Sequence, residues 1–120
     1  MKNKTLVLGA STNIQRYSNT AIRELTKNHH PVVAFGKRSG TVAHVVIDTE
    51  LVDYPDIDTV TLYLNPQNQK EFYDYIISLK PRRVIFNPGT ENPEFIEMLK
   101  DHGIIPEIAC TLVLLSLSSY

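Results

Sequence analysis

Short apolar runs alternate with segments of helical period along this chain of 120 residues, and this alternation limits the possible folds more than any other feature. The runs have the length of β-strands and occupy residues 5–8, 31–35, 42–47, 58–64, 84–86 and 104–109, of which 42–47 is only a short extended piece. Helical periodicity occupies residues 18–28, the segments after Pro66 and Pro93, and residues 111–117. We predict a single α/β domain over residues 1–120, with an open, doubly wound, mainly parallel sheet of about five strands and helices on both faces.

Capping residues mark the expected helix ends. Asn65-Pro66 and Asn92-Pro93 each place an asparagine before a proline in the first helical position. Ser18 is the candidate N-cap of the first helix, and Gly103 is expected to close the helix that begins at Pro93.

The charge balance argues against a broad nucleic-acid-binding surface. Twelve Lys and Arg residues against thirteen Asp and Glu residues give a net charge of -1, so any anion site must be local. The one cysteine, Cys110, precludes an internal disulfide framework and favours a cytoplasmic location. No apolar run is long enough to cross a bilayer as a helix, so we expect no membrane partner.

The loop after the first strand is the main candidate site, because ligands of doubly wound sheets lie beyond the carboxyl ends of the strands. Gly9 allows a close turn, while Ser11, Thr12 and Ser18 offer hydroxyl groups. Arg16 adds a forked cation suited to phosphate oxygens. The alternative is a polar surface loop in which Ser18 only caps its helix and Arg16 is solvated.

Two features argue against NAD as the ligand. Ser11 and Ile14 stand where the dinucleotide fingerprint has its second and third glycines. No carboxylate follows the second strand to bind the ribose hydroxyls; Lys37 and Arg38 stand there instead. One of these cations could meet the phosphate on the ribose of NADP or coenzyme A (CoA), unless both are ordinary solvated charges.

The segment GASTNIQRYS at residues 9–18 resembles the opening motif of small standalone CoA-binding domain proteins. That family is Rossmann-like and is related to the nucleotide-binding domain of the succinyl-CoA synthetase alpha subunit. The phrases YPDIDTVTLYLNP at 54–66 and NPGTENPEF at 87–95, together with Cys110 and Thr111, agree with the family in order and spacing. The chain departs from it at Phe35-Gly36, where members often have Asn-Pro.

The resemblance covers nearly the whole chain and implies binding of CoA or an acyl-CoA. It places around the phosphates Gly9, Ser11, Thr12, Arg16 and Ser18. Lys37 and Arg38 match the adenosine side loosely. On the same expected edge, Asn65, Pro66, Pro88 and Gly89 could contact the ligand through backbone groups, although capping and turn formation also account for them.

No constellation for catalysis or metal binding is evident in the sequence. Cys110 could be a nucleophile, but no histidine is placed to act as its base, and a structural thiol is the simpler interpretation. The four histidines lack the spacing of a metal site, so we expect no metal.

We therefore predict a CoA-binding module that is not catalytic on its own and works with a protein partner or as a homodimer. The alternatives are a small NADP-dependent oxidoreductase and a partner-binding domain without a ligand.

Overall fold

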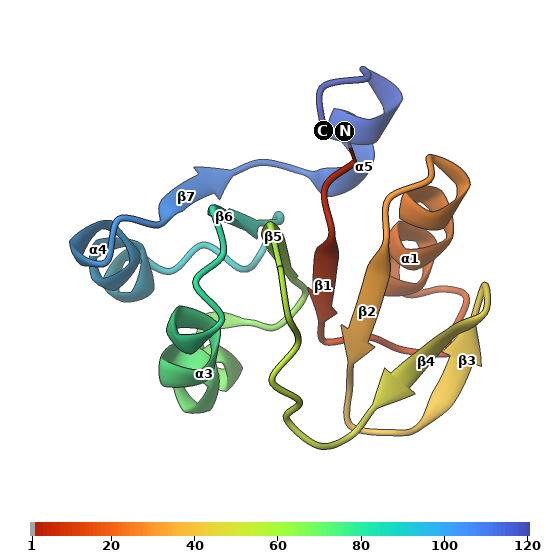
Figure 1. Cartoon of the computed structure of the whole chain (residues 1–120), viewed down its shortest axis with the longest axis horizontal. Coiled ribbons are helices and arrows are strands. Elements are labelled where there is room, and N and C mark those ends of the chain that lie inside the picture. The colour runs from red at the N-terminus through yellow and green to blue at the C-terminus, as the bar shows by residue number, and fades with distance from the viewer. Residues whose placement is uncertain (1) are drawn as a thin grey trace.

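The computed structural model describes residues 2–120, which contain a seven-stranded sheet in the order β3-β4-β2-β1-β5-β6-β7 (Figure 1). Six of its strands run parallel to one another: β1 (Thr5–Leu8), β2 (Val32–Phe35), β4 (Val45–Asp48), β5 (Thr59–Leu62), β6 (Arg83–Phe86) and β7 (Ile105–Ile108). The seventh, β3 (Gly40–Val42), is antiparallel to β4. The α/β class and the mainly parallel sheet are confirmed, whereas the predicted number of about five strands is wrong and the sheet is mixed.

The miscount comes from a β-hairpin beyond β2. The piece predicted at 42–47 reverses direction, because Ala43 and His44 form a two-residue turn with φ of 48° and 68°. Such turns favour Gly, Asn or Asp, so the Ala-His pair carries no turn signal in the sequence. The hairpin places β3 and β4 at the edge of the sheet next to β2.

Helices cover both faces of the sheet (Figure 1). On one face lie α1 (Tyr17–Lys27) and α5 (Thr111–Ser116), and on the other lie α3 (Tyr73–Ser78) and α4 (Pro93–Asp101). The helix predicted after Pro66 is divided into α2 (Pro66–Gln69), the 3-10 helix η1 (Lys70–Phe72) and α3. No helix among residues 2–120 has the length and apolar character needed to cross a membrane.

Two of the three predicted N-caps are confirmed. The side-chain oxygens of Asn65 and Asn92 accept hydrogen bonds from the backbone N–H groups three residues later, at 2.9 and 3.1 Å. Gly103 follows α4 with φ of 71°, as a residue that ends a helix should. The Ser18 prediction is wrong: α1 starts one residue earlier, and its N-cap is Arg16, which makes no side-chain capping bond.

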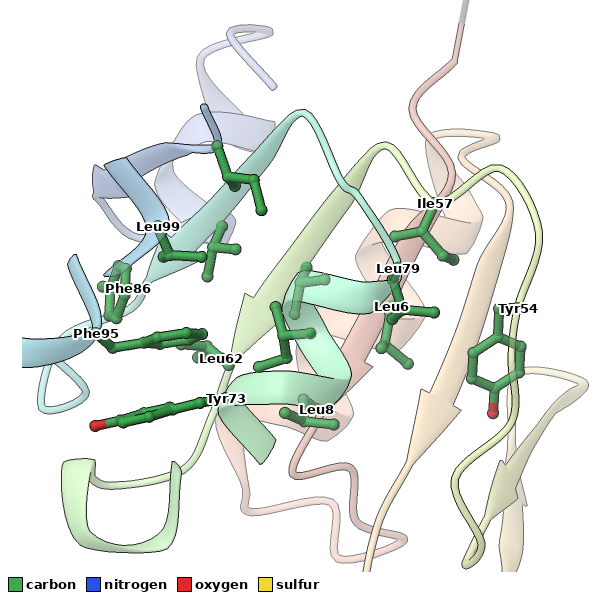
Figure 2. Packing of buried hydrophobic residues seen from close by; sticks show 14 residues of the cluster. Leu6, Leu8, Tyr54, Ile57, Leu62, Tyr73, Leu79, Phe86, Phe95 and Leu99 are labelled. Carbon is green, nitrogen blue, oxygen red and sulfur yellow. The ribbon is translucent and has the colours of Figure 1, made fainter. Parts of the chain in front are cut away.

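The alternation of side chains along the buried strands divides the core into two layers, and Figure 2 shows the layer packed under α3 and α4. Leu6 and Leu8 of β1 pack toward α3 and α4, where the rings of Tyr73 and Phe95 stack with centroids 4.3 Å apart. Val7 points the other way, into the cluster under α1. Because β1 is buried on both faces, a slip of one residue would exchange its two sets of side chains. Burial on both faces therefore fixes the register of β1, and its carboxyl end lies level with those of β2 and β5.

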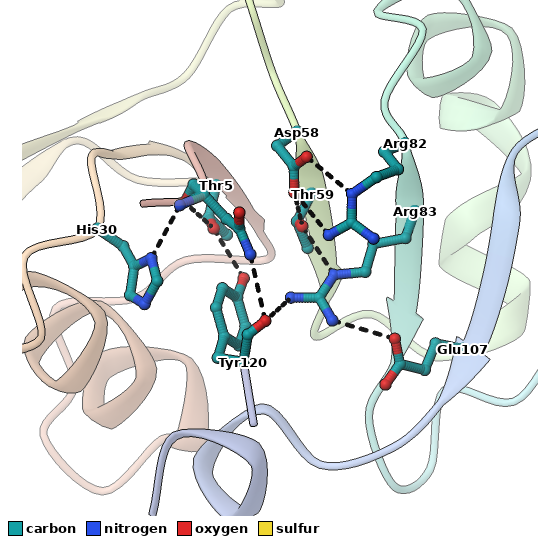
Figure 3. Close-up of polar contacts among 9 residues, drawn as sticks. Thr5, His30, Asp58, Thr59, Arg82, Arg83, Glu107 and Tyr120 are labelled. Carbon is teal, nitrogen blue, oxygen red and sulfur yellow. Dashed lines mark hydrogen bonds and ion pairs between the residues drawn. The ribbon is translucent and has the colours of Figure 1, made fainter. Parts of the chain in front are cut away.

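A polar cluster stabilises the end of the sheet at which the parallel strands begin (Figure 3). The Arg83 side chain is 5% exposed and donates to Thr59 Oγ1 at 2.9 Å, to Glu107 Oε1 at 3.1 Å and to the carbonyl oxygen of Tyr120 at 3.0 Å. The Tyr120 hydroxyl is hydrogen-bonded to Thr5 Oγ1 at 2.7 Å. The cluster ties the segment after α5 to the start of β1, away from the candidate site.

Candidate ligand-binding site

The loop after β1 crosses the switch point of the sheet, where β2 lies on one side of β1 and β5 on the other. The N–H groups of Gly9 and Ala10 both donate to the carbonyl oxygen of Phe35, at 3.0 and 2.9 Å. Gly9 has φ of 95°, and a methyl group there would lie 2.8 Å from the carbonyl oxygen of Tyr63. Only glycine fits at position 9, because the loop packs there against the end of β2 and against Tyr63, which follows β5.

Side chains within the loop and on α1 hold its conformation. Ser11 Oγ accepts from the N–H of Asn13 at 3.0 Å, and Asn13 Oδ1 accepts from the N–H of Gln15 at 2.9 Å. Asn19, buried on α1, donates from Nδ2 to the carbonyl oxygen of Ser11 at 3.0 Å. The loop is thus shaped before any ligand arrives, and the Ser11 hydroxyl, predicted as a phosphate donor, also serves this internal turn.

The folded loop leaves a group of backbone donors without partners. Within residues 2–120, no acceptor is bonded to the N–H groups of Ser11, Thr12, Ile14, Tyr17 and Ser18. The last two belong to the first turn of α1, where free N–H groups and the positive end of the helix dipole favour an anion. Ser18 therefore offers a free backbone N–H in the first turn of α1 rather than a capping side chain.

Exposed cations lie in this loop and in the loop after β2. Arg16, Lys37 and Arg38 are exposed, and the two ion pairs found among residues 2–120 involve neither loop. Residues 2–42 hold seven of the twelve Lys and Arg residues but only one of the thirteen Asp and Glu residues, a formal charge of +6 against -7 for residues 43–120. Because the two charges nearly cancel, the net charge of -1 does not reveal this division of the chain. The sequence analysis did not identify it, although it can be counted from the sequence.

The residues after β5 and β6 that were predicted to contact a ligand lie at the carboxyl ends of these strands, and they also form helix caps and turns. Asn65 uses its side-chain oxygen to cap α2, with Pro66 in the first turn. Pro88 and Gly89 are exposed; Gly89 has φ of 90°, and its N–H donates to Glu91 Oε1 at 2.9 Å. Contact of these residues with a ligand stays a prediction.

A buried amide cluster that sequence analysis did not find connects these two loops. Gln69 is fully buried, and its Nε2 donates to the carbonyl oxygens of Leu64 and Thr90, both at 2.8 Å. Its Oε1 accepts from Asn92 Nδ2 at 3.0 Å. A glutamine in a short polar helix gives no sequence signal for burial, yet this one holds the two loops in a fixed relation.

Asn87 joins the end of β6 to α5. Its Nδ2 donates to the carbonyl oxygen of Leu62 at 2.8 Å, and its Oδ1 accepts from the N–H of Thr111 at 2.9 Å. These bonds fix the start of α5 and the position of Cys110 just before it. Cys110 is half-buried and makes no side-chain capping bond.

Burial raises the pKa of Tyr63, whose hydroxyl has no hydrogen-bond partner within residues 2–120. No group of three or more His, Cys, Asp or Glu side chains in the same range could hold a metal ion.

Several solved structures share this fold. An uncharacterised protein is 48% identical to this chain, with a TM-score of 0.97 and coverage of 100% of this chain and 99% of the other. A hypothetical protein from Pyrococcus horikoshii OT3 is 23% identical, covers 93% and 80% of the two chains and has a TM-score of 0.84. Cell-free ID.343 from Thermus thermophilus is 19% identical, covers 99% and 91%, and has a TM-score of 0.87. At these lower identities the last two support the fold alone.

A family model matches almost the whole chain. The model of the CoA binding domain matches residues 3–116, from just before β1 to the end of α5. No match was found among curated proteins.

Proposed function

Since this chain belongs to the CoA binding domain family, we propose that it binds coenzyme A or an acyl-CoA at the loop after β1. The observation that carries the proposal is the set of five N–H groups, at residues 11, 12, 14, 17 and 18, that have no partner within residues 2–120. Thr12, Ile14 and Tyr17 are exposed, so these donors are open to a ligand, and a run of free N–H groups around a helix start suits phosphate.

These donors would hydrogen-bond the pyrophosphate of the ligand. Arg16 is exposed at the N-cap of α1 and would neutralise the same group with charged hydrogen bonds. The hydroxyls of Ser11 and Thr12 could add further donors, because a hydroxyl that accepts one hydrogen bond can still donate another. Binding would then need little rearrangement of the loop, which Asn13 and Asn19 already hold in shape.

The phosphorylated adenosine end of the ligand would lie toward the cationic half of the chain. Lys37 and Arg38 follow β2 and would attract this end. Their side chains are exposed and form no ion pair within residues 2–120, so their charges are available to a phosphate. The rest of the ligand would extend past the carboxyl ends of β5 and β6 and would contact backbone groups of Asn65, Pro66, Pro88 and Gly89.

The domain would act as a binding module rather than as an enzyme on its own. A protein partner, or a second copy of the chain, would then use the bound CoA or respond to it. In this proposal Cys110 packs at the start of α5 and takes no part in chemistry.

Isothermal titration calorimetry with CoA, dephospho-CoA, NAD and NADP tests the proposal. We expect CoA to bind most tightly, with dephospho-CoA retaining the pyrophosphate contacts at lower affinity. Tightest binding of NADP would favour the oxidoreductase alternative, and no binding or equal binding of all four ligands would refute the proposal. Mass spectrometry of the purified, denatured protein provides a second readout, since co-purified CoA would argue against a domain without a ligand.

A further inference from the structure

A shallow groove of about 370 Å³ lies between the loop after β1, helix α1 and strand β3. Its volume is toward the lower end of the range for small-molecule sites, roughly 300–1,000 Å³. The loop and β3 are in close contact here, because a methyl group on Gly40 would lie 2.3 Å from Cγ2 of Thr12. The side chains that line the groove come from Thr12, Ile14, Asn19, Arg23, Thr41 and Val42.

The Arg23 guanidinium is held at this groove by a neighbour that also shapes the loop. Its Nε donates to Asn19 Oδ1 at 2.9 Å, while Nδ2 of the same Asn19 donates to the carbonyl oxygen of Ser11 at 3.0 Å. Asn19 is 2% exposed, so the Arg23 side chain, although exposed, is oriented by a buried partner. Nη2 donates to the Thr20 hydroxyl at 3.5 Å. Within residues 2–120, Nη1 has no partner and Arg23 makes no ion pair.

The chemistry of the lining indicates an anion with several oxygens. The groove combines a guanidinium that Asn19 orients with the hydroxyl-bearing residues Thr12 and Thr41, and no acidic side chain lines it. Thr12 and Ile14 also belong to the set of residues whose backbone N–H groups are unpaired, so the groove adjoins the donors of the loop. A planar guanidinium with adjacent hydroxyl donors matches a phosphate monoester, which presents three acceptor oxygens.

We propose that this groove binds a phosphate monoester, and that in the complex with CoA it holds the 3′-phosphate against Arg23. The second part rests on the proposed function. Lys37 and Arg38 would then attract the ligand from a distance, whereas Arg23 would make the fixed contact, because only Arg23 is oriented by a buried side chain.

The test compares CoA with dephospho-CoA, which lacks only the 3′-phosphate, by calorimetry on the wild type, on Arg23→Gln and on the double variant K37Q/R38Q. We expect the wild type to prefer CoA at least 10-fold, Arg23→Gln to lose this preference while its affinity for dephospho-CoA stays within twofold, and K37Q/R38Q to retain most of it. Arg23→Lys should keep part of the preference, since it retains the charge but not the fork.

Three results would overturn the proposal: the preference survives in Arg23→Gln, it disappears in K37Q/R38Q instead, or Arg23→Gln weakens both ligands equally. The last result would mean that Arg23 supports the loop without touching the phosphate. If the wild type binds neither ligand, the proposed function fails, and the groove is then tested with adenosine 3′,5′-bisphosphate. In that case, binding that is at least 10-fold weaker in Arg23→Gln supports the groove, and equal or absent binding overturns it.

Discussion

Gly36 lies so close to the loop after β1 that a methyl group on its α-carbon would come within 2.3 Å of the carbonyl oxygen of Ala10. The N–H of Ala10 is meanwhile bonded to the carbonyl oxygen of Phe35 at 2.9 Å. The two loops that flank the candidate site therefore contact each other through their backbones, and only glycine fits between them.

Replacing Gly36 with alanine should displace Ala10 and disturb the unpaired N–H groups of Ser11 and Thr12. Overpacking of this kind costs about 1–3 kcal/mol, so urea denaturation should show a lower free energy of unfolding and calorimetry a weaker affinity for CoA. Ser39→Ala, at an exposed position in the same loop, is the matched control and should change neither quantity. Equal behaviour of the two variants would contradict the close contact.

Arg16→Ala should weaken CoA binding by about 1.5–3 kcal/mol, the usual contribution of hydrogen bonds to a charged group. The free energy of unfolding should hardly change, because Arg16 is exposed and its side chain caps nothing. Lys27→Ala removes an exposed cation at the other end of α1 and serves as the control. Calorimetric titrations that give the two variants the same affinity would remove Arg16 from the site.

The adjacent arginines Arg82 and Arg83 should differ sharply in their effect on stability. Arg83→Met leaves the partners of a buried guanidinium unpaired and should cost about 3 kcal/mol. Arg82→Met breaks the pair with Asp58, in which the Arg82 side chain is 50% exposed, and should cost about 1 kcal/mol or less. Urea denaturation measures both values; a cost for Arg82→Met equal to or above that of Arg83→Met would show that the cluster in Figure 3 is not buried in solution.

His30 should make the stability depend on pH. Burial, with the charges of Lys2 and Arg83, lowers the pKa of His30, while Nδ1 accepts from the N–H of Asn3 at 3.0 Å. The unfolded chain then takes up the proton first as the pH falls. The contribution of neutral His30 is therefore present above the unfolded pKa, about 6.5, and is lost as the pH falls through the lower folded pKa.

Thermal unfolding between about pH 7.5 and about pH 5.5 tests this expectation. The melting temperature of the wild type should fall more steeply with decreasing pH than that of His30→Asn, which keeps a hydrogen-bond acceptor but cannot titrate. His29→Asn, at the exposed neighbouring position, should keep the wild-type slope. If His30→Asn also keeps that slope, His30 titrates normally in the folded protein.

Most of the fold follows from the sequence because the strands and helices have distinct periodicities. The apolar runs at 5–8 and 84–86 indicate buried strands, and the structure buries all seven of these residues. The burial of Arg83 at the start of β6 does not follow from the pattern. The β3–β4 hairpin does not follow, because Ala43 and His44 adopt positive φ without the residues that favour it. Tertiary packing must hold this turn, and a local pattern cannot report such packing.

The candidate site was only partly predictable for a similar reason. The position of the loop after β1 follows from the topology of doubly wound sheets, and Gly9 and Arg16 stand out by residue type. The orientation of Arg23 does not, because it depends on Asn19, which looks like an ordinary polar residue on a helix. The unpaired N–H groups are equally invisible in a sequence, since every residue except proline has one.

The account depends most on the statement that backbone N–H groups of the loop after β1 bind the phosphates of CoA. A titration of ¹⁵N-labelled protein with CoA, followed by two-dimensional NMR of the amides, tests it most directly. The largest shifts should occur at the amides of Ser11, Thr12, Ile14, Tyr17 and Ser18, because these gain an acceptor. Saturating CoA that leaves these five amides unchanged, or shifts chiefly the amides of β7 and α5, would contradict it.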